Sequence, residues 1–488
     1  MFYPSLEKAA ELSKNYSKVP VSLEIYMDFH TPIAVLSHIR EKYDEYFLLE
    51  SIEGGEKWAR YTFLGFNPKE LFYVKEGRAF HKKAEGTKEL AGNPIDLLKD
   101  ILKDYTAPKD KNLPPLTGGA VGYFGYETVK YVEDIALSND DHLKAEDIKL
   151  MFFDELIAFD HLKQKITLIA NIDGNAKNIT KAYEEAKNKL MALYQLINEP
   201  ARKHTIIFDE EINFASNMTK EAFMENVMKA KAYIENGDIF QVVLSQVFKT
   251  KLNCELFDVY RVLRTINPSP YMYFMKFKDI EVAGASPETL VKVQDGTVIT
   301  QPIAGTRRRG KTDEEDARIE EDLLGDKKER AEHNMLVDLA RNDVGKISEF
   351  NSVQVSDYMA FKRLSHVIHL TTNVRGKLRQ GFDSIDAVRE LLPAGTLSGA
   401  PKVRAMEIIE ELETEKRGVY GGAIGYIGYD GNLDTCIAIR TVVKKDNIAY
   451  IQAGAGIVLD SDPESEYKET ITKASAVFDA IRKVGEMK

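Results

Sequence analysis

Two pairs of glutamates, each with its members three residues apart, are the first feature of this sequence that could carry chemistry. They are Glu329 with Glu332 and Glu466 with Glu469, and Lys473 follows the second pair at a helical spacing. Both pairs extend helical stripes that become apolar further along, so the charged groups are predicted to face a core. Four carboxylates close together suit a hard cation such as Mg²⁺. The alternative interpretation is two partly buried, salt-bridged helix starts.

A loop rich in glycine, threonine and serine, followed by a helix, could bind an anion. It spans 395–402, and Pro401 is expected at the first position of the helix. A loop that opens a helix in this way presents free N–H groups to a carboxylate or phosphate. A plain helix cap needs only one such residue, so the excess favours a binding site. Gly454 and Gly456 likewise leave open backbone ahead of a helix predicted from Asp462 onward.

Two histidines lie close together in a β-branched run that is typical of a strand. His366 and His369 would then point to opposite faces of the sheet. A lone histidine in a strand is more often a structural residue than a catalyst, so at least one of the two is expected to be structural.

The rest of the chain is predicted to supply strands and helices in mixed order. Helices are predicted at 5–14, 31–43, 94–104, 175–198 and 219–236. Strands are predicted around 45–50, 59–66, 119–126, 151–159 and 165–171. The stretch 199–218 is the best candidate linker, and the acidic run 313–322 is interpreted as a solvated face.

One segment of the sequence is repeated far along the chain. The residues Gly-Gly-Ala-Val-Gly-Tyr-Phe-Gly-Tyr at 118–126 return as Gly-Gly-Ala-Ile-Gly-Tyr-Ile-Gly-Tyr at 421–429. The repeat indicates that two halves of the molecule use the same supersecondary unit. Its mixture of β-branched, aromatic and glycine residues favours antiparallel strands, so the fold class is predicted to be α+β.

Composition excludes several classes of protein. The 488 residues are ample for a large core, and the net charge of −11 argues against binding to nucleic acid or to an anionic membrane. The two cysteines, Cys254 and Cys436, are too far apart to suggest a metal site, and they fit a reducing compartment. No signal pattern or membrane-length apolar run is found, so a cytoplasmic location is expected.

Taken together, the motifs resemble those of the anthranilate synthase component I family, the large chorismate-utilising subunit. The matching motifs are Leu-Leu-Glu-Ser at 48–51, Asn-Pro-Ser-Pro-Tyr-Met at 267–272, Ala-Ser-Pro-Glu at 285–288, Pro-Ile-Ala-Gly-Thr at 302–306 and Gly-Thr-Leu-Ser-Gly-Ala-Pro-Lys at 395–402, with the Glu329/Glu332 segment and 452–474. The resemblance runs essentially end to end. It implies a four-layer α/β/β/α sandwich with two orthogonally packed, largely antiparallel sheets.

The resemblance also implies a reaction, a Mg²⁺-dependent carbon–oxygen lyase step of tryptophan biosynthesis. Ammonia adds to the ring of chorismate, the ring hydroxyl leaves, and pyruvate is eliminated to give anthranilate. By resemblance the catalytic residues are Glu288 as general acid, His369 and Thr396. The implied Mg²⁺ ligands are Glu329, Glu332, Glu466 and Glu469. The implied substrate-binding residues are Tyr420, Arg440, Gly454, Gly456, Lys473 and Gln241. Lys473 is expected to act as a ligand contact more than as an ion-pair partner of Glu469.

Two positions sort this chain among related enzymes. Isochorismate- and salicylate-forming relatives carry a water-activating lysine where this sequence has Gln241. Aminodeoxychorismate synthase usually has a lysine where this sequence has Ala304. Both differences favour the anthranilate-forming enzyme. Aminodeoxychorismate synthase component I is the alternative, and a non-catalytic amino-acid sensor or scaffold subunit is a further one.

The resemblance further implies feedback inhibition by L-tryptophan and a partner subunit. The implied tryptophan-binding residues are Glu50, Ser51, Pro270, Tyr271 and Met272, with Arg60 as a looser match. The alternative for 48–51 is a buried strand that ends at a turn. A separate glutamine amidotransferase is expected to supply ammonia. On this interpretation, 1–200 forms an N-terminal region with the regulatory site and 219–488 forms the chorismate-binding catalytic region.

Overall fold

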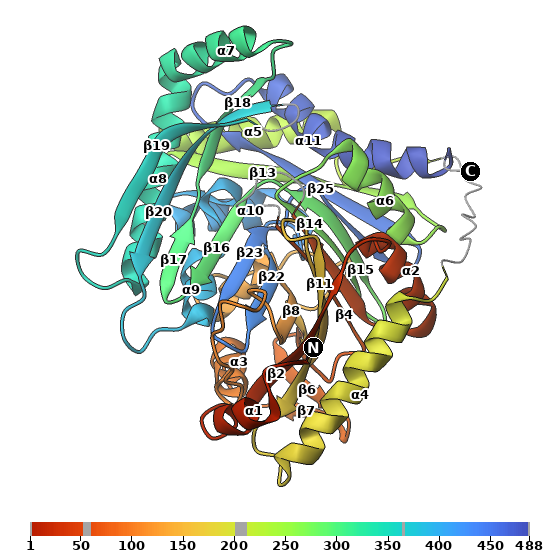
Figure 1. The fold of residues 1–488 in the computed structure, drawn as a ribbon. Coiled ribbons are helices and arrows are strands. Elements are labelled where there is room, and N and C mark those ends of the chain that lie inside the picture. The colour runs from red at the N-terminus through yellow and green to blue at the C-terminus, as the bar shows by residue number, and fades with distance from the viewer. Residues whose placement is uncertain (1, 52–59, 201–211, 364–366, 487–488) are drawn as a thin grey trace.

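The computed structural model describes residues 2–51, 60–200, 212–363 and 367–486 (Figure 1). Within these residues a first sheet contains 13 strands, all paired antiparallel. Its order is β1 (Phe2–Tyr3), β2 (Lys18–Tyr26), β11 (Lys165–Asp173), β10 (Glu155–Asp160), β4 (Tyr61–Phe66), β3 (Tyr46–Glu50), β14 (Tyr271–Lys276), β15 (Glu281–Ser286), β24 (Thr441–Lys445), β25 (Ile448–Ile457), β13 (Gln241–Lys251) and β12 (Ala215–Ser216), with β21 (Gly399–Ala400) beside β13.

A second antiparallel sheet contains 12 strands in the same described residues. Its order is β18 (Ile303–Arg308), β20 (Val367–Lys377), β17 (Thr297–Thr300), β16 (Thr289–Gln294), β23 (Leu433–Ile437), β22 (Ala423–Gly428), β8 (Gly119–Phe124), β9 (Ile148–Phe153), β5 (Glu70–Lys75), β6 (Arg78–Lys83) and β7 (Gly86–Leu90), with β19 (Gln354–Arg363) beside β20.

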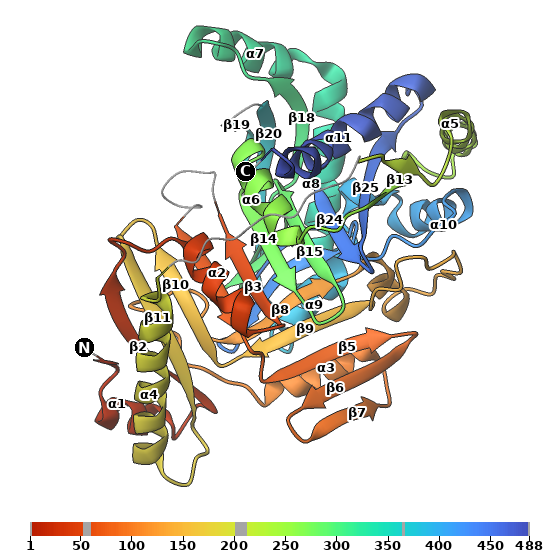
Figure 2. The same cartoon turned by 90° about the vertical axis from the view of Figure 1, so that its right-hand side faces the viewer.

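The helices cover the outer faces of the two sheets (Figures 1 and 2). Those packed on the first sheet are α1 (Leu6–Leu12), α2 (Pro32–Lys42), α4 (Ile179–Ile197), α5 (Lys220–Glu235), α6 (Leu256–Ile266), α10 (Lys402–Leu412) and α11 (Pro463–Val484). Those packed on the second are α3 (Pro94–Lys103), α8 (Lys327–Ile347) and α9 (Ser384–Leu391). Helix α7 (Asp313–Gly325) projects from the body of the molecule in both views.

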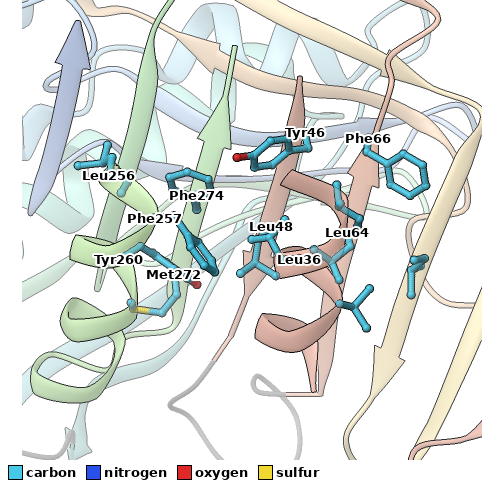
Figure 3. Close-up of a cluster of buried hydrophobic side chains, with 14 of the residues drawn as sticks. Leu36, Tyr46, Leu48, Leu64, Phe66, Leu256, Phe257, Tyr260, Met272 and Phe274 are labelled. Carbon is cyan, nitrogen blue, oxygen red and sulfur yellow. The ribbon is translucent and has the colours of Figure 1, made fainter. Parts of the chain in front are cut away.

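Three large apolar cores separate these layers. The core between the sheets joins side chains of both, including Phe47 and Tyr273 of the first and Tyr123 and Phe153 of the second. The core outside the first sheet is drawn in Figure 3, where Phe257 and other side chains of α6 pack against β14 and α2 packs against β3 and β4. Each buried side chain of this size contributes about 1.5–3 kcal/mol. The predicted α+β, four-layer α/β/β/α fold is confirmed.

The repeated sequence segments are direct neighbours in the second sheet. Strand β8 pairs antiparallel with β22, with Phe124 opposite Ala423 and Gly119 opposite Gly428. In the first sheet β3 pairs with β14 in the same antiparallel manner. Each sheet therefore joins a strand from the predicted region 1–200 to a strand from the predicted region 219–488. The predicted regions 1–200 and 219–488 share both sheets and a common core, and the boundary between them stays a prediction.

The predicted elements are largely present, with three local differences. The helix predicted at 175–198 begins at Ile179, where the side chain of Asn178 caps it. The strand predicted at 151–159 is the end of β9 and most of β10, separated by Asp154. The predicted linker 199–218 includes β12 and, at 201–211, lies partly outside the described residues. Among the described residues, no helix combines the length and apolarity needed to cross a membrane.

Candidate active site

Glu288 lies in the turn between β15 and β16, where it faces Thr396. The Thr396 hydroxyl donates a hydrogen bond of 3.0 Å to Glu288 Oε1. Thr396 sits in a single 3₁₀ turn, η2 (Gly395–Leu397), and both side chains line a small cavity of about 40 Å³. Burial raises the pKa of Glu288 to about 7, although the Thr396 hydrogen bond and the nearby Lys473 lower it. A carboxyl with such a pKa can hold a proton near neutral pH and release it.

His369 lies on β20, next to a bulge in β18. Its Nδ1 is 3.1 Å from the carbonyl oxygen of Gly305 and 3.0 Å from the hydroxyl of Thr306. The carbonyl oxygen can only accept, so a proton on Nδ1 satisfies that contact, the hydroxyl can accept as well, and Nε2 is then free to accept. Gly305 has a φ of 63°, a left-handed conformation that the bulge between Ala304 and Thr306 requires. Burial and the positive charges of Lys362 and Arg440 lower the pKa of His369, so the imidazole is neutral at neutral pH. His366 lies outside the described residues.

Arg440 and Tyr420 lie near each other on the same side of the first sheet. Arg440 stands between β23 and β24 with a φ of 52°, and its guanidinium has no hydrogen bond or ion pair with any described residue. Burial lowers its pKa, and the charges of Tyr420 and Glu469 act in the opposite direction. A half-buried, unpaired cation is costly, so this position suits an anionic group of a ligand.

The two glycines of β25 keep the backbone open beside these side chains. A Cβ on Gly454 would lie 2.9 Å from the Tyr420 hydroxyl, and a Cβ on Gly456 would lie 2.6 Å from Gln241 Nε2. Strand β25 pairs with β13, which carries Gln241 at its start. The Oε1 atom of Gln241 is buried and makes no hydrogen bond within the described part of the chain. A side chain at either glycine would therefore displace a predicted substrate-binding residue.

The four glutamates of the predicted metal site lie in the first two turns of α8 and α11. Burial raises the pKa of Glu332, and the charges of Glu329 and Glu469 raise it further. The pKa of Glu466 is likewise raised, first by burial and then by Glu469. Across the two helices, Glu332 is thus within electrostatic range of Glu469, and the four-carboxylate metal site stays a prediction.

Two of these four carboxylates form ion pairs with basic side chains of the chain. Arg307 donates to Glu329 at 2.8 Å, and Lys473 bonds Glu469 at 2.7 Å and the carbonyl oxygen of Gly454 at 3.0 Å. Lys473 therefore pairs with Glu469 in this structure, and its role as a ligand contact stays a prediction. The Glu469 side chain is 46% exposed, so the charged end of the stripe lies at the rim of the site and not in a core.

The acidic side chains suit Mg²⁺ chemically, although two of them form ion pairs in this structure. In the residues that the structure describes, no three His, Cys, Asp or Glu side chains are gathered closely enough to hold a metal. The donor set nevertheless consists only of carboxylate oxygens, which hard cations prefer. Glu332 and Glu466 form no ion pair with any described residue, and a cation would relieve the repulsion that each experiences from Glu469. The residues fit the group, provided that the ion pairs of Glu329 and Glu469 exchange.

The anion site predicted at the start of α10 differs from the expectation. Pro401 occupies the N-cap position, and the helix begins at Lys402. Lys402 is engaged with Asp343 at 2.7 Å. The loop contributes to the site through Thr396 instead, by way of its contact with Glu288.

The predicted tryptophan-binding residues meet at a second, larger cavity of about 570 Å³. The cavity lies between the sheets, and its lining includes Glu50, Ser51, Arg60, Pro270, Tyr271 and Met272. Glu50 is buried at the end of β3, where Arg264 donates to both of its oxygens and Tyr260 donates to one. The strand interpretation and the binding interpretation of 48–51 are therefore compatible.

Two arginines at these sites were missed at the sequence level. Arg307 follows directly on the motif at 302–306, and the basic run that it opens was a usable signal. Arg264 lies one helical turn from the end of α6, and nothing in its spacing pointed to Glu50. Both pairings depend on contacts between elements far apart in sequence.

Comparison with known proteins identifies the family of the chain. A model of the chorismate binding enzyme family matches residues 44–479. The chain is 48% identical over 496 residues to anthranilate synthase component 1 of Acetivibrio thermocellus, with 100% of each chain covered. It is 45% identical over 483 residues to the protein of that name from Aquifex aeolicus, with 98% and 97% covered.

A solved structure shows the same architecture. The crystal structure of anthranilate synthase component I from Streptococcus pneumoniae TIGR4 superposes with a TM-score of 0.79 at 38% identity, covering 93% of this chain and 98% of the other. The menaquinone-specific isochorismate synthase of Escherichia coli shares only the fold, at a TM-score of 0.69 and 17% identity, with 98% of each chain covered.

Proposed function

Because this chain belongs to the chorismate-binding enzyme family, and within it to the anthranilate synthase component I group, we propose that it forms anthranilate from chorismate and ammonia. Pyruvate and water are the other products. The observation that carries the proposal is the contact of Glu288 with the Thr396 hydroxyl, in a buried position that raises the pKa of Glu288 to about 7. The reaction is that of a carbon–oxygen lyase.

Glu288 is the proposed general acid. It would protonate the ring hydroxyl of chorismate as that group leaves, a role that contributes about 10²–10⁴-fold. The Thr396 hydroxyl bonds Glu288 Oε1, so Oε2 would be the oxygen that carries the donated proton. His369 would accept or return a ring proton through Nε2, since Nδ1 is bonded to Gly305.

Arg440 and Tyr420 are proposed to bind the enolpyruvyl carboxylate. The guanidinium suits a planar, bidentate contact, and it makes no competing contact with a described residue. The close backbone at Gly454 and Gly456 would let the substrate approach β25. Lys473 would reach the substrate after it exchanges its contact with Glu469.

The substrate's ring carboxylate is proposed to lie over the acidic cluster. Bound Mg²⁺ would supply a template and a Lewis acid for that carboxylate. Its proposed ligands, direct or through water, are Glu329, Glu332, Glu466 and Glu469.

Ammonia is the proposed nucleophile. Gln241 cannot serve as a base that activates water, whereas ammonia is already nucleophilic. A separate glutamine amidotransferase subunit is the proposed source of ammonia, and the pair would act in the cytoplasm. L-Tryptophan is proposed to bind in the 570 Å³ cavity and to inhibit the enzyme.

A fluorescence assay tests the proposal. Purified chain is mixed with chorismate, Mg²⁺ and concentrated ammonium at alkaline pH, and anthranilate emission is followed, with Glu288→Gln as the inactive control. Formation of 4-amino-4-deoxychorismate would instead support the alternative of aminodeoxychorismate synthase, which Ala304 disfavours. Tight chorismate binding without turnover would support the sensor or scaffold alternative.

A further inference from the structure

Arg417, a buried arginine that was not among the predicted site residues, hydrogen-bonds to three segments that border the site. Arg417 lies between α10 and β22 and is 3% exposed. It donates to Glu413 through Nε at 2.9 Å, to the carbonyl oxygen of Leu397 through Nη1 at 2.6 Å, and to that of Val243 through Nη2 at 2.7 Å. All three nitrogens of the guanidinium are therefore in use.

Its partner, Glu413, is equally enclosed. Glu413 Oε1 accepts a second bond from Arg417 Nη2 and further bonds of 2.8 Å from both the backbone N–H and the hydroxyl of Ser245 on β13. Burying two charges costs several kcal/mol per ion before their attraction is counted, so a buried pair is weak evidence for stability alone. One use attested for such pairs is to fix a particular geometry.

The acceptors of Arg417 are adjacent to proposed catalytic residues. Leu397 follows Thr396, whose hydroxyl bonds Glu288. Val243 pairs with Gly456 across the β13–β25 ladder. The guanidinium also lies over the ring of Tyr420, 5.7 Å from its centroid.

We propose that Arg417, held by Glu413, is a positioning residue that fixes the Thr396 turn and Tyr420 against β13. It acts on catalysis through Thr396, because the turn cannot shift away from Glu288 while Leu397 is bonded to the guanidinium. The catalytic part of this role rests on the proposed function. If Arg417 only stabilised the fold, replacing it would leave kcat/KM and the pH profile of the folded enzyme unchanged.

The test uses Arg417→Lys, which keeps the charge and loses the planar fork that serves three acceptors. We expect kcat/KM to fall by about 10²-fold, the scale of a misplacement of roughly 1 Å in a catalytic site. The pH at which kcat/KM declines should also move upward, because the Thr396 hydrogen bond lowers the pKa of Glu288.

The matched control is Lys149→Met, which breaks another buried pair, with Glu146 and Asp279. It should lower the melting temperature and leave the pH profile in place. In a Thr396→Val background, Arg417→Lys should cause no further movement of the profile, because the two residues act in sequence.

Two outcomes overturn the proposal. One is a folded Arg417→Lys enzyme with wild-type kcat/KM and pH profile, and the other is a full additional shift in the Thr396→Val background. If Arg417→Lys does not fold, Glu413→Gln is judged by the same two measurements. If the wild type forms no anthranilate, the proposed function fails instead, and chorismate binding by calorimetry still tests the positioning role. An unchanged Kd would then overturn it, and a weakened one would support it.

Discussion

The hydroxyl of Tyr271 lies 2.9 Å from the hydroxyl of Thr289, the residue that follows Glu288. Tyr271 also donates to Asp434 Oδ1 at 2.9 Å, which uses its only proton, so Thr289 is the donor in the first bond. Because Tyr271 lines the 570 Å³ cavity, we expect a ligand bound there to affect Thr289, the neighbour of Glu288, through this hydrogen bond. The proposed inhibitor site is thus connected to the proposed acid by one hydrogen bond, from Thr289 to Tyr271, and by the peptide bond between Glu288 and Thr289.

Tyr271→Phe should weaken this link while keeping the ring that fills the cavity. The lost hydroxyl is expected to raise the tryptophan concentration for half inhibition by about fivefold, the equivalent of one hydrogen bond of about 1 kcal/mol. Inhibition curves of anthranilate formation measure this. Tyr73→Phe, on β5 and outside the cavity lining, is the control. Identical curves for the wild type and Tyr271→Phe would refute the link.

Ser51→Ala should relieve inhibition by tryptophan, because Ser51 lines the cavity at the end of β3. The variant removes one hydroxyl and adds no bulk. Equilibrium binding of tryptophan and inhibition curves are measured together, with Ser475→Ala on α11 as the control. Wild-type activity that ignores millimolar tryptophan would show that the regulatory proposal is wrong.

The raised pKa of Glu288 predicts that activity and stability both decline as pH rises. With free ammonia held constant, kcat/KM should fall as pH rises through about 7, because the acid loses its proton. The folded carboxyl has a raised pKa, from 4.5 to about 7, so ionisation destabilises the fold progressively across that interval. Below it both states are protonated and no cost remains.

Glu288→Gln isolates that cost. At pH 8 the variant should be more stable than the wild type by about 2–3 kcal/mol, and at pH 4.5 the two should be nearly equal. Denaturant unfolding at both pH values measures the difference. Comparison with the wild type at each pH removes the contribution of Glu127, a second buried carboxyl whose pKa is raised to about 7. A constant difference between the two pH values would show that Glu288 is not ionising in this range.

Glu469→Gln should abolish turnover with little effect on stability. Its ion pair with Lys473 is half exposed, and such pairs contribute about 0–1 kcal/mol. Glu464→Gln on the same helix is the matched control, because Glu464 pairs with Lys220 and Lys468 and lies outside the proposed metal site. Turnover and thermal unfolding are measured for both. An unfolded Glu469→Gln, or one with normal turnover, would favour the salt-bridge interpretation.

Local patterns predicted much of the fold, because caps, periodicity and the repeated segment act over short stretches. The repeat at 118–126 and 421–429 foretold the central strands β8 and β22, although not that they pair with each other. The helical spacing of Lys473 left open whether it pairs with Glu469 or binds a ligand. Its choice between Glu469 and a ligand depends on the distance to Gly454, which tertiary packing sets.

Contacts between distant elements account for the other misses at the site. Pro401 satisfies the pattern of a first helical residue, yet the chain path beside β13 places it one position earlier, as the cap. Arg307 and Arg417 are identifiable as charged residues in the sequence, but their roles follow from partners that only the folded chain supplies.

The most direct test of the central claim is a mass balance of a single reaction. Chorismate, Mg²⁺ and ammonium are incubated with the purified chain, and chorismate, anthranilate and pyruvate are quantified together by chromatography. The proposed activity predicts one anthranilate and one pyruvate for each chorismate consumed, and no product without ammonium. Pyruvate without anthranilate, or an amino product that retains the enolpyruvyl group, would contradict it.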